Sequence, residues 1–487
     1  MNTPLRRVAI AVMILVAALL ANATYVQVIK ADDLRADPRN SRVLLDEYAR
    51  QRGQISAQGQ VLAESRPTDD RYKYLRVYPQ PLAFAPVTGF YSIQHANRGL
   101  EFTEDAVLNG SDNRLFGRRF FDMVSGRDPR GGNVVTTLNP LMQQVAYEQL
   151  SAKGYKGSVV AIEPSSGNIL AMASTPSYDP NLLSGHDGPQ GTKNWDQLNG
   201  DPNKPLLNRA IEERYPPGST FKVLVTAAAL AKGTKVDDQF TAAPRITLPG
   251  TSTTLENYNG STCGNGPTAP LREAFARSCN TAFVELGIKT GATALKEQAA
   301  AFGIGSNMEV PLQVRPSTLG DLSDDAIVGQ SSIGQRDVAL TPLQNAVIAA
   351  TIANGGLRME PHLVAQLQGP DLSNLATTRA TSVGQAISPQ VASQLTELMI
   401  GSENFTGGPG KIPNVQIASK TGTAEHGSDP RNTPPHTWYI AFAPAQNPKV
   451  AVAVIVEEGG DRALAATGGS VAAPIGREVI KAGLAVR

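Results

Sequence analysis

The pattern of apolar and polar residues shows one long apolar segment near the amino end of the chain. Two arginines precede an unbroken apolar run, Val8–Leu20, which continues more weakly to Val28. Counted to Val28, the run is long enough to cross the ~30 Å hydrocarbon core of a bilayer as a helix. The arginines indicate that residues 1–7 form a cytoplasmic tail. We therefore expect residues 8–28 to be a transmembrane anchor.

A cleaved signal peptide is the alternative interpretation of this segment. Ala21-Asn22-Ala23 fits the small-residue cleavage pattern, and the strongest apolar stretch is short. Under both interpretations the rest of the chain leaves the cytoplasm. We expect a single-pass protein of the cell membrane with its main part on the extracytoplasmic side.

Residues 29–135 are polar, with mixed charges and frequent turns. The segment Phe102–Leu115 is expected to be a polar helix. No chemistry stands out in this region. We interpret it as an elongated, non-catalytic docking module.

The pattern changes near Gly131, where apolar strands begin. Gly157–Pro164 and Ile169–Ala173 are apolar runs on either side of a Ser-Ser-Gly turn, which predicts a hairpin. Three more strands and a closing helix are expected near the other end: Val415–Ala424, His436–Phe442, Lys449–Val456 and the helix Val471–Ala485.

Residues 205–355, between these groups of strands, are predicted to be mostly helical. Strands at both ends with helices between them predict an α+β domain over residues 136–487. Its single antiparallel sheet would be assembled from distant parts of the chain and sandwiched by helices, with an all-helical region beside it.

Composition excludes some functions. The 487 residues carry 44 Lys plus Arg and 43 Asp plus Glu, a net charge of +1, which argues against a nucleic-acid-binding protein that depends on neutralising phosphates. Two cysteines cannot by themselves hold a zinc ribbon or an iron–sulfur cluster, and no His/Asp cluster has ligand spacing. We expect no metal and no cofactor.

The first candidate for chemistry is the serine of Pro216-Pro217-Gly218-Ser219-Thr220-Phe221-Lys222. A rigid turn leads into a helix, so Ser219 lies at the helix start and Lys222 one turn later on the same face. Burial and the helix dipole push such an amine towards its neutral form, which can take the hydroxyl proton. The alternative is an N-cap serine and a solvated lysine, since Ser-x-x-Lys alone occurs by chance.

The second candidate is Ser278-Cys279-Asn280, at the expected joint between the helices Leu271–Arg277 and Thr281–Gly287. A hydroxyl and a carboxamide two residues apart can face one cleft, where they relay a proton and bind a peptide amide. Taken alone, a polar helix junction explains this triplet equally well.

The third candidate is Lys420-Thr421-Gly422-Thr423, after a predicted strand. Gly422 lets a ligand approach the backbone, and the lysine and the two threonines suit a peptide carboxylate laid beside the strand. The backbone N–H groups of Thr423 and Ser219 are candidates for an oxyanion hole. The alternative is a glycine-kinked strand with a surface lysine.

Together and in this order, the three motifs are specific, and the chain resembles the class B penicillin-binding proteins, which are D,D-transpeptidases of peptidoglycan. Its small size and Cys279 inside the second motif are most similar to actinobacterial members, which are associated with septal wall synthesis and cell division. Other segments share the resemblance: Arg52–Ile55, Gly59–Ala63, Gly157–Ala173, Ser332–Gln335 and Leu340–Gln344.

The resemblance implies a role for each matched residue. Ser219 is acylated by the donor stem peptide while D-alanine leaves, Lys222 is the general base, and Ser278 passes the proton towards the leaving amine. β-Lactams would acylate the same serine. The remaining matched residues hold the substrate: Asn280, Lys420, Thr421, Gly422 and Thr423.

Two features depart from the family or lie outside its usual motif. Ser56-Ala57 stands where the family usually carries an acidic–basic pair, which affects the amino-terminal module and not the site. Cys263 and Cys279 form either a disulfide that tethers the active-site loop, plausible after export, or two separate buried thiols.

Other functions remain as competing hypotheses. A Ser-His-Asp hydrolase would need one of the five histidines as its base, although all are interpretable as loop residues: His95, His186, His362, His426 and His436. A β-lactamase or D,D-carboxypeptidase must activate water, and no Glu-x-x-Leu-Asn segment of the class A β-lactamase type is present. A β-lactam sensor or a divisome scaffold is a non-enzymatic alternative.

The expected partners follow from the same resemblance. The substrates are peptidoglycan stem peptides, with β-lactams as their analogues. No glycosyltransferase domain is visible before Gly131, so we expect a membrane-embedded glycan polymerase and division proteins as partners.

Overall fold

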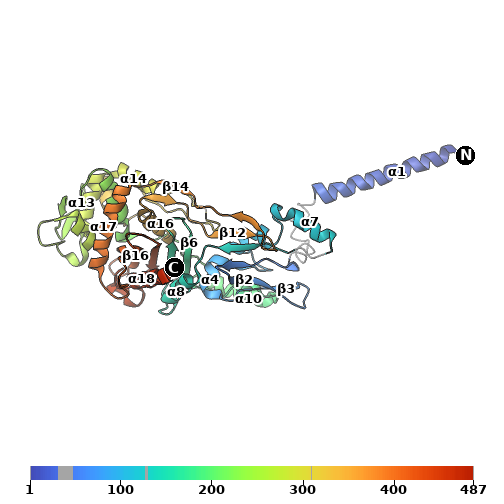
Figure 1. Ribbon diagram of the computed structural model, residues 1–487. Coiled ribbons are helices and arrows are strands. Elements are labelled where there is room, and N and C mark those ends of the chain that lie inside the picture. The colour runs from blue at the N-terminus through green and yellow to red at the C-terminus, as the bar shows by residue number, and fades with distance from the viewer. Residues whose placement is uncertain (1, 31–47, 127–129, 309, 486–487) are drawn as a thin grey trace.

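The computed structural model describes residues 2–30, 48–126, 130–308 and 310–485 (Figure 1). At the amino end, helix α1 (Asn2–Thr24) continues into a π-helical turn, η1 (Tyr25–Ile29), and stands apart from the body. Within the described residues, this is the one helix long and apolar enough to cross a membrane. The helix contains the predicted anchor. A signal sequence near the amino end would meet the same criteria of length and composition.

The central sheet has the strand order β15-β16-β17-β5-β6, and every neighbouring pair in it is antiparallel. Its strands come from both ends of the predicted domain, which confirms a sheet assembled from distant parts of the chain. Their bounds are β5 Gly157–Ile162, β6 Ile169–Thr175, β15 Ala418–Ala424, β16 His436–Ala443 and β17 Val450–Val456.

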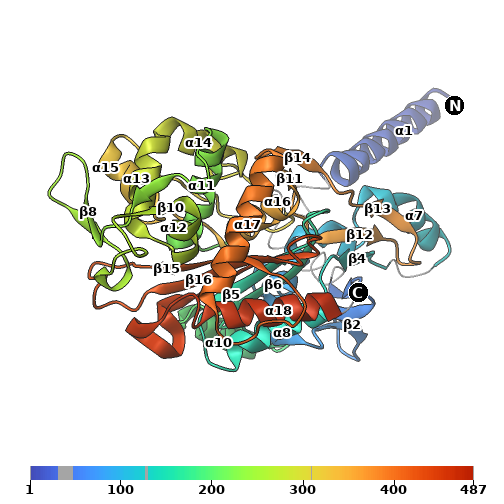
Figure 2. The ribbon, with the colours of Figure 1, turned by 60° about the vertical axis from the view of Figure 1, so that its left-hand side comes forward.

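Helices cover both faces of this sheet (Figure 2). Helices α8 (Pro140–Ser151) and α18 (Ala472–Ala485) pack on one face, and α16 (Pro342–Ala353) packs on the other. Because β17 alternates, Val452 and Val454 join the core under α8 and α18, while Ala451 and Ala453 join the core under α16. Helix α17 (Pro389–Thr406) lies along β15.

The predicted helical region lies beside α16 and α17, on the side of the central sheet away from α18 (Figure 2). Its helices are α11 Lys222–Ala231, α12 Leu271–Arg277, α13 Asn280–Thr290, α14 Ala292–Ala301 and α15 Asp325–Ser331. Two short two-stranded sheets accompany them: β7 Gln239–Thr241 with β10 Thr268–Pro270, and β8 Arg245–Thr247 with β9 Thr254–Glu256. The α+β architecture expected from the sequence is therefore confirmed.

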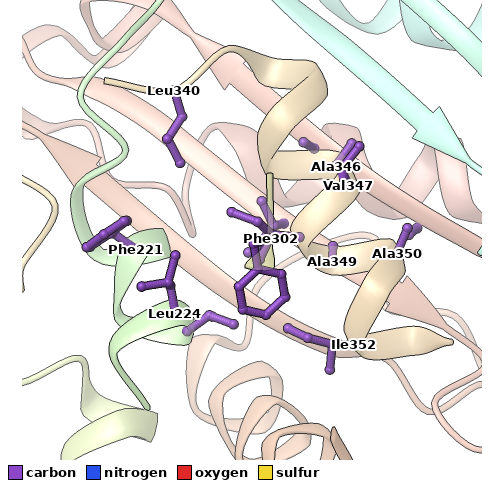
Figure 3. Packing of buried hydrophobic residues seen from close by; sticks show 14 of the residues in the cluster. Phe221, Leu224, Phe302, Leu340, Ala346, Val347, Ala349, Ala350 and Ile352 are labelled. Atoms are coloured by element: carbon purple, nitrogen blue, oxygen red, sulfur yellow. The ribbon is translucent and has the colours of Figure 1, made fainter. Parts of the chain in front are cut away.

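A buried cluster supports the start of α11 (Figure 3). Phe221 and Leu224 face Phe302 and the side chains of α16, and all three are at most 1% exposed. Burying a side chain of this size stabilises the fold by roughly 1.5–3 kcal/mol. The turn that carries Ser219 is therefore attached to the rigid core.

A second sheet, with the strand order β13-β12-β4-β1-β2-β3, forms the amino-terminal part of the body. Its strands are β1 Ile55–Ala57, β2 Gln60–Pro67, β3 Tyr74–Val77, β4 Asn133–Thr136, β12 Val364–Gln368 and β13 Asn374–Thr377. The last two come from beyond residue 360, so the expected boundary at 135 does not separate two self-contained sheets. A separate two-stranded antiparallel sheet is formed by β11 Leu357–Met359 and β14 Ser382–Gln385.

Helices of this part include α4 Pro81–Thr88, α9 Asn181–Ser184 and α10 Gly188–Gly200. The expected helix Phe102–Leu115 was wrong as a single element, because it is broken into α5 Leu100–Thr103, α6 Asp105–Leu108 and the 3₁₀ turn η2 Asn113–Leu115. Gly110, at a φ of +79°, forms the break after α6. Helix α7 (Phe116–Val124) follows directly.

Buried charges hold the start of this module. The carboxylate of Glu101 accepts hydrogen bonds from the Nε atoms of Arg52 and Arg76, each at 2.6 Å. Ser56 and Ala57, which depart from the family pattern, lie in β1 and pair with β2. The departure therefore leaves the strand intact. The segment 31–47, where the predicted module begins, lies outside the described residues.

Candidate active site

The first motif begins as a 3₁₀ turn, η3 (Gly218–Phe221), and continues into α11 at Lys222. The backbone N–H of Lys222 donates to the carbonyl of Ser219, so the two residues are one turn apart as predicted. Ser219 is half-buried, whereas Lys222 is 0% exposed. The turn thus leaves the serine partly exposed while the lysine one turn later is buried.

The Lys222 ammonium reaches the second motif. Its Nζ donates to the carbonyl oxygen of Ser278 at 2.7 Å and to Oδ1 of Asn280 at 2.8 Å, and it lies 3.3 Å from Oγ of Ser278. Within the described residues, no hydrogen bond joins Oγ of Ser219 to this amine. The contact between nucleophile and base stays a prediction.

Burial lowers the pKa of Lys222 well below its usual 10.5, and the nearby Lys420 lowers it further. A neutral amine has two N–H donors and one lone pair. The two donors are occupied by Ser278 O and Asn280 Oδ1, so the lone pair is left to accept a proton from a hydroxyl. This is the arrangement that a general base requires.

Ser278 lies between the two lysines. It follows α12 in a left-handed conformation, with a φ of +62°, and this turn separates α12 from α13 as the sequence predicts. The Lys420 Nζ donates to its Oγ at 2.9 Å and to the carbonyl oxygen of Thr421 at 3.0 Å. Burial lowers the pKa of Lys420 to about 7.

The third motif lies on β15, which is an edge strand because it stands at the end of the sheet and, among the strands that the structure describes, pairs with β16 alone. Its backbone approaches the first motif closely. A Cβ at Gly422 would lie 2.8 Å from the carbonyl oxygen of Pro217, and one at Gly218 would lie 2.8 Å from that of Thr423. Side chains at either position would push the serine turn away from the strand.

Three further contacts, with no signal in the sequence, hold these motifs in place. The indole Nε1 of Trp438 donates to the carbonyl of Pro216 at 2.9 Å, and the N–H of Gly218 donates to that of Gly334 at 2.9 Å. The amide Nδ2 of Asn280 donates to the carbonyl of Glu256 at 2.8 Å. Gly334 belongs to the Ser332–Gln335 segment noted above for its resemblance.

A buried ion pair supports β15 from behind. One carboxylate oxygen of Glu403, on α17, accepts from the Nε of Arg477, on α18, at 2.8 Å and forms an ion pair with its Nη2 at 2.7 Å. The other accepts from Ser419 at 2.5 Å and from Tyr439 at 3.0 Å. Ser419 immediately precedes Lys420, so this pair anchors the strand next to Lys420.

The histidines contribute little to this site. His426 and His436 stack on each other with ring centres 3.7 Å apart, and burial together with His426 lowers the pKa of His436 to about 3. The Nδ1 of His436 accepts from the backbone N–H of Glu458. Among the described residues, neither ring is hydrogen-bonded to the serine or lysines of the motifs.

Cys263 and Cys279 form a disulfide in the structure, with Cα atoms 5.9 Å apart. Both are at most 5% exposed. The bond links the second motif to the loop that precedes β10.

A cavity of about 1360 Å³ lies elsewhere in the body, and none of the motif residues lines it.

Comparison with known families gives two matches. Residues 157–481 match the family model described as the penicillin-binding protein transpeptidase domain. Residues 52–134 match the one described as the penicillin-binding protein A dimerisation domain. The first match spans the central sheet and all three motifs.

Curated relatives match the whole chain. The peptidoglycan D,D-transpeptidase PbpA of Mycolicibacterium smegmatis is 63% identical over 99% of both chains. That of Mycobacterium tuberculosis is 61% identical with the same coverage. The expected similarity to an actinobacterial protein of this type is confirmed.

Solved structures agree with these matches. A ceftriaxone acyl-enzyme complex of penicillin-binding protein A from M. tuberculosis has a TM-score of 0.89 at 61% identity, covering 90% of this chain and 100% of that one. The penicillin G acyl-enzyme complex has a TM-score of 0.87 at 60% identity, covering 89% and 100%.

Proposed function

The chain belongs to the penicillin-binding protein transpeptidase family, and on that premise we propose that it crosslinks peptidoglycan stem peptides through an acyl-enzyme on Ser219. The relatives that match its full length are peptidoglycan D,D-transpeptidases, and the chain is an enzyme of that serine type. The observation that carries the proposal is the hydrogen-bonded set of Lys222, Ser278, Asn280 and Lys420, with both lysines fully buried and Ser219 one helical turn before Lys222.

The proposed acylation begins with Lys222. Its neutral amine takes the proton of the Ser219 hydroxyl as Oγ attacks the carbonyl carbon of the penultimate D-alanine. The new C–O bond forms and the peptide C–N bond breaks. The proton passes from Lys222 through the hydroxyl of Ser278 to the leaving amine, which departs as D-alanine. The 3.3 Å separation between Lys222 Nζ and Ser278 Oγ supports this route.

Substrate binding is assigned to the third motif. The edge strand β15 offers an unpaired side along which an extended peptide can add. Lys420, with Thr421 and Thr423, would hold the peptide carboxylate, and Gly422 would leave room for the backbone. The close approach of Gly218 to Thr423 supports an oxyanion hole made of the N–H groups of residues 219 and 423.

The second half of the reaction regenerates the enzyme. An acceptor amine attacks the acyl carbon, the C–O bond to Ser219 breaks, and the serine recovers its proton as the crosslink forms. A β-lactam would acylate the same serine, as the acyl-enzyme complexes of the M. tuberculosis relative illustrate for that protein. The amide of Asn280, already held by Lys222 and Glu256, is assigned both to fix the amine and to bind peptide.

We further propose that residues 8–28 retain the protein in the cell membrane, with the docking module (29–135) and the catalytic domain (136–487) on the extracytoplasmic side. The apolar helix α1 supports the anchor. Partnership with a membrane-embedded glycan polymerase and a role in septal wall synthesis and division rest on the family resemblance. A fluorescent fusion that fails to concentrate at division sites would contradict the septal role.

The decisive experiment for the activity uses the full-length protein in vesicles with lipid-linked peptidoglycan precursor and a membrane glycan polymerase. The proposal predicts crosslinked muropeptides that disappear with Ser219→Ala or with penicillin G. Release of D-alanine without crosslinks would indicate a carboxypeptidase, and rapid hydrolysis of the drug a β-lactamase. Neither product, with stable drug binding, would indicate a sensor or scaffold.

A further inference from the structure

An exposed apolar surface lies on α7 and on the turn between β12 and β13. Phe116, Phe121 and Val124 of α7 are 61%, 64% and 71% exposed, and Leu372 of the turn is 68% exposed. We call these four residues the α7 patch. Large apolar side chains grouped in this way on a protein surface mark an interaction site.

The apolar residues of α7 and the side of α7 that packs on the body lie on opposite sides of the helix. At 100° per residue, Phe116, Phe121 and Val124 lie within one arc of the helix, and Asp122 lies opposite. Asp122 is 8% exposed, so the helix is docked on the body through its polar side. The apolar arc is therefore turned outward by the way in which the helix is attached.

Arg118 fixes α7 to the turn that carries Leu372. Its Nη1 pairs with Asp371 at 2.5 Å, and its Nε lies 3.7 Å from Asp122. The helix and the turn thus form one unit. Arg114, paired with Asp112, and Arg118 keep side chains about 40% exposed beside the apolar arc.

The position of this unit indicates what covers it. In Figures 1 and 2, α7 lies at the end of the body nearest α1, and the tip of β12 reaches the same end. Only residues 31–47 separate α1 from the rest of the described chain. A span of this length reaches at most about 60 Å, so the anchor keeps this end of the body within that distance of the bilayer.

We propose that the α7 patch inserts into the lipid interface of the membrane that holds α1, a proposal that rests on the proposed anchor. Aromatic and aliphatic side chains enter the acyl boundary of a bilayer, and flanking arginines keep their charged ends among the phosphates. With α1, this contact gives the body a second attachment and so fixes the orientation of the active site relative to the membrane.

The test uses the full-length protein in phosphatidylcholine–phosphatidylglycerol vesicles that contain spin-labelled lipid. A fluorophore is placed singly at Phe121→Cys, Val124→Cys and Leu372→Cys, which is feasible because the described cysteines are joined in a disulfide. Leu15→Cys in α1 reports the anchor. Leu464→Cys, 57% exposed in η5 (Glu457–Ala465), which packs against β16, is the control of matched exposure.

The proposal predicts that lipid quenching at 121, 124 and 372 exceeds that at 464 by at least about twofold, and that Phe116→Glu with Phe121→Glu abolishes the difference at 124. Quenching at 15 without quenching in the patch would overturn the proposal and leave the anchor intact. Quenching at neither would overturn both. If the labels in the patch are shielded both from lipid and from aqueous iodide, a second copy of the chain covers the patch. That result would also overturn the proposal.

Discussion

Lys222 and Lys420 converge on one hydroxyl, with their Nζ atoms 3.3 and 2.9 Å from Oγ of Ser278. Both side chains are 0% exposed, and no carboxylate within the described residues is paired with either. Two buried, adjacent ammonium groups repel each other, so protons leave the pair readily. Burial lowers the pKa of both amines, that of Lys420 to about 7, and the neighbouring Lys420 lowers the pKa of Lys222 further.

Replacing Lys222 tests the assignment of the base. Lys222→Met keeps the length of the side chain and removes the amine, so acylation by penicillin G should slow by roughly 10²–10⁴-fold. Stopped-flow or gel-based acylation kinetics measure this directly. Lys232→Met, at the other end of the same helix and exposed, is the matched control and should acylate at the normal rate. Equal rates for both variants would exclude Lys222 as the base.

The pKa of Lys420 predicts a pH profile. Below about pH 7 the ammonium is charged and holds a substrate carboxylate, and above it the free enzyme loses this charge. The second-order rate constant for acylation by a carboxylate-bearing β-lactam should therefore fall as the pH rises from 7 to 9. The rate at saturating drug should fall less, because bound carboxylate raises the pKa of the lysine. A second-order constant that is level from pH 6 to 9 would be inconsistent with this role.

The Glu403–Arg477 pair predicts a specific pattern in a double-mutant cycle. Glu403→Gln leaves a fully buried guanidinium uncompensated and should destabilise the protein by about 3–5 kcal/mol. Adding Arg477→Met removes the stranded charge, so the double variant should be more stable than Glu403→Gln alone. Urea unfolding measures the cycle. Simple addition of the two losses would show that the charges are not coupled.

The disulfide predicts a loss of stability on reduction. Cys263 and Cys279 are 16 residues apart, and closing a loop of this size contributes about 3 kcal/mol in the chain-entropy model. Cys263→Ala with Cys279→Ala should lower the Tm and slow acylation, since Cys279 lies between Ser278 and Asn280. If neither quantity changes, the bond does not tether the active-site loop.

Much of this architecture is readable from local sequence patterns. The apolar runs at His436–Phe442 and Lys449–Val456 predict β16 and β17 closely, because central strands are buried on both faces and contain few polar residues. The three motifs that contain Lys222, Ser278 and Lys420 are likewise visible in the sequence, since the proposed chemistry restricts which residue types can occupy these positions.

Long-range pairing is not readable in this way. The strands β12 and β13 join the amino-terminal sheet from far along the chain, where Asn133 and Gly369 meet across 236 residues, and Glu403 meets Arg477 across 74 residues. Nothing local in the sequence specifies such partners. The contacts of Trp438 with Pro216 and of Gly334 with Gly218 escape prediction for the same reason, because a backbone carbonyl leaves no mark on the sequence.

The most direct test of the account is the site of the covalent bond to penicillin. Intact-mass spectrometry of the full-length protein after penicillin G, followed by peptide mapping, should give one adduct per chain, located on Ser219. Ser219→Ala should carry no adduct while keeping the Tm of the unmodified protein. An adduct that persists in Ser219→Ala, or that maps to Ser278 or another residue, would contradict the central claim.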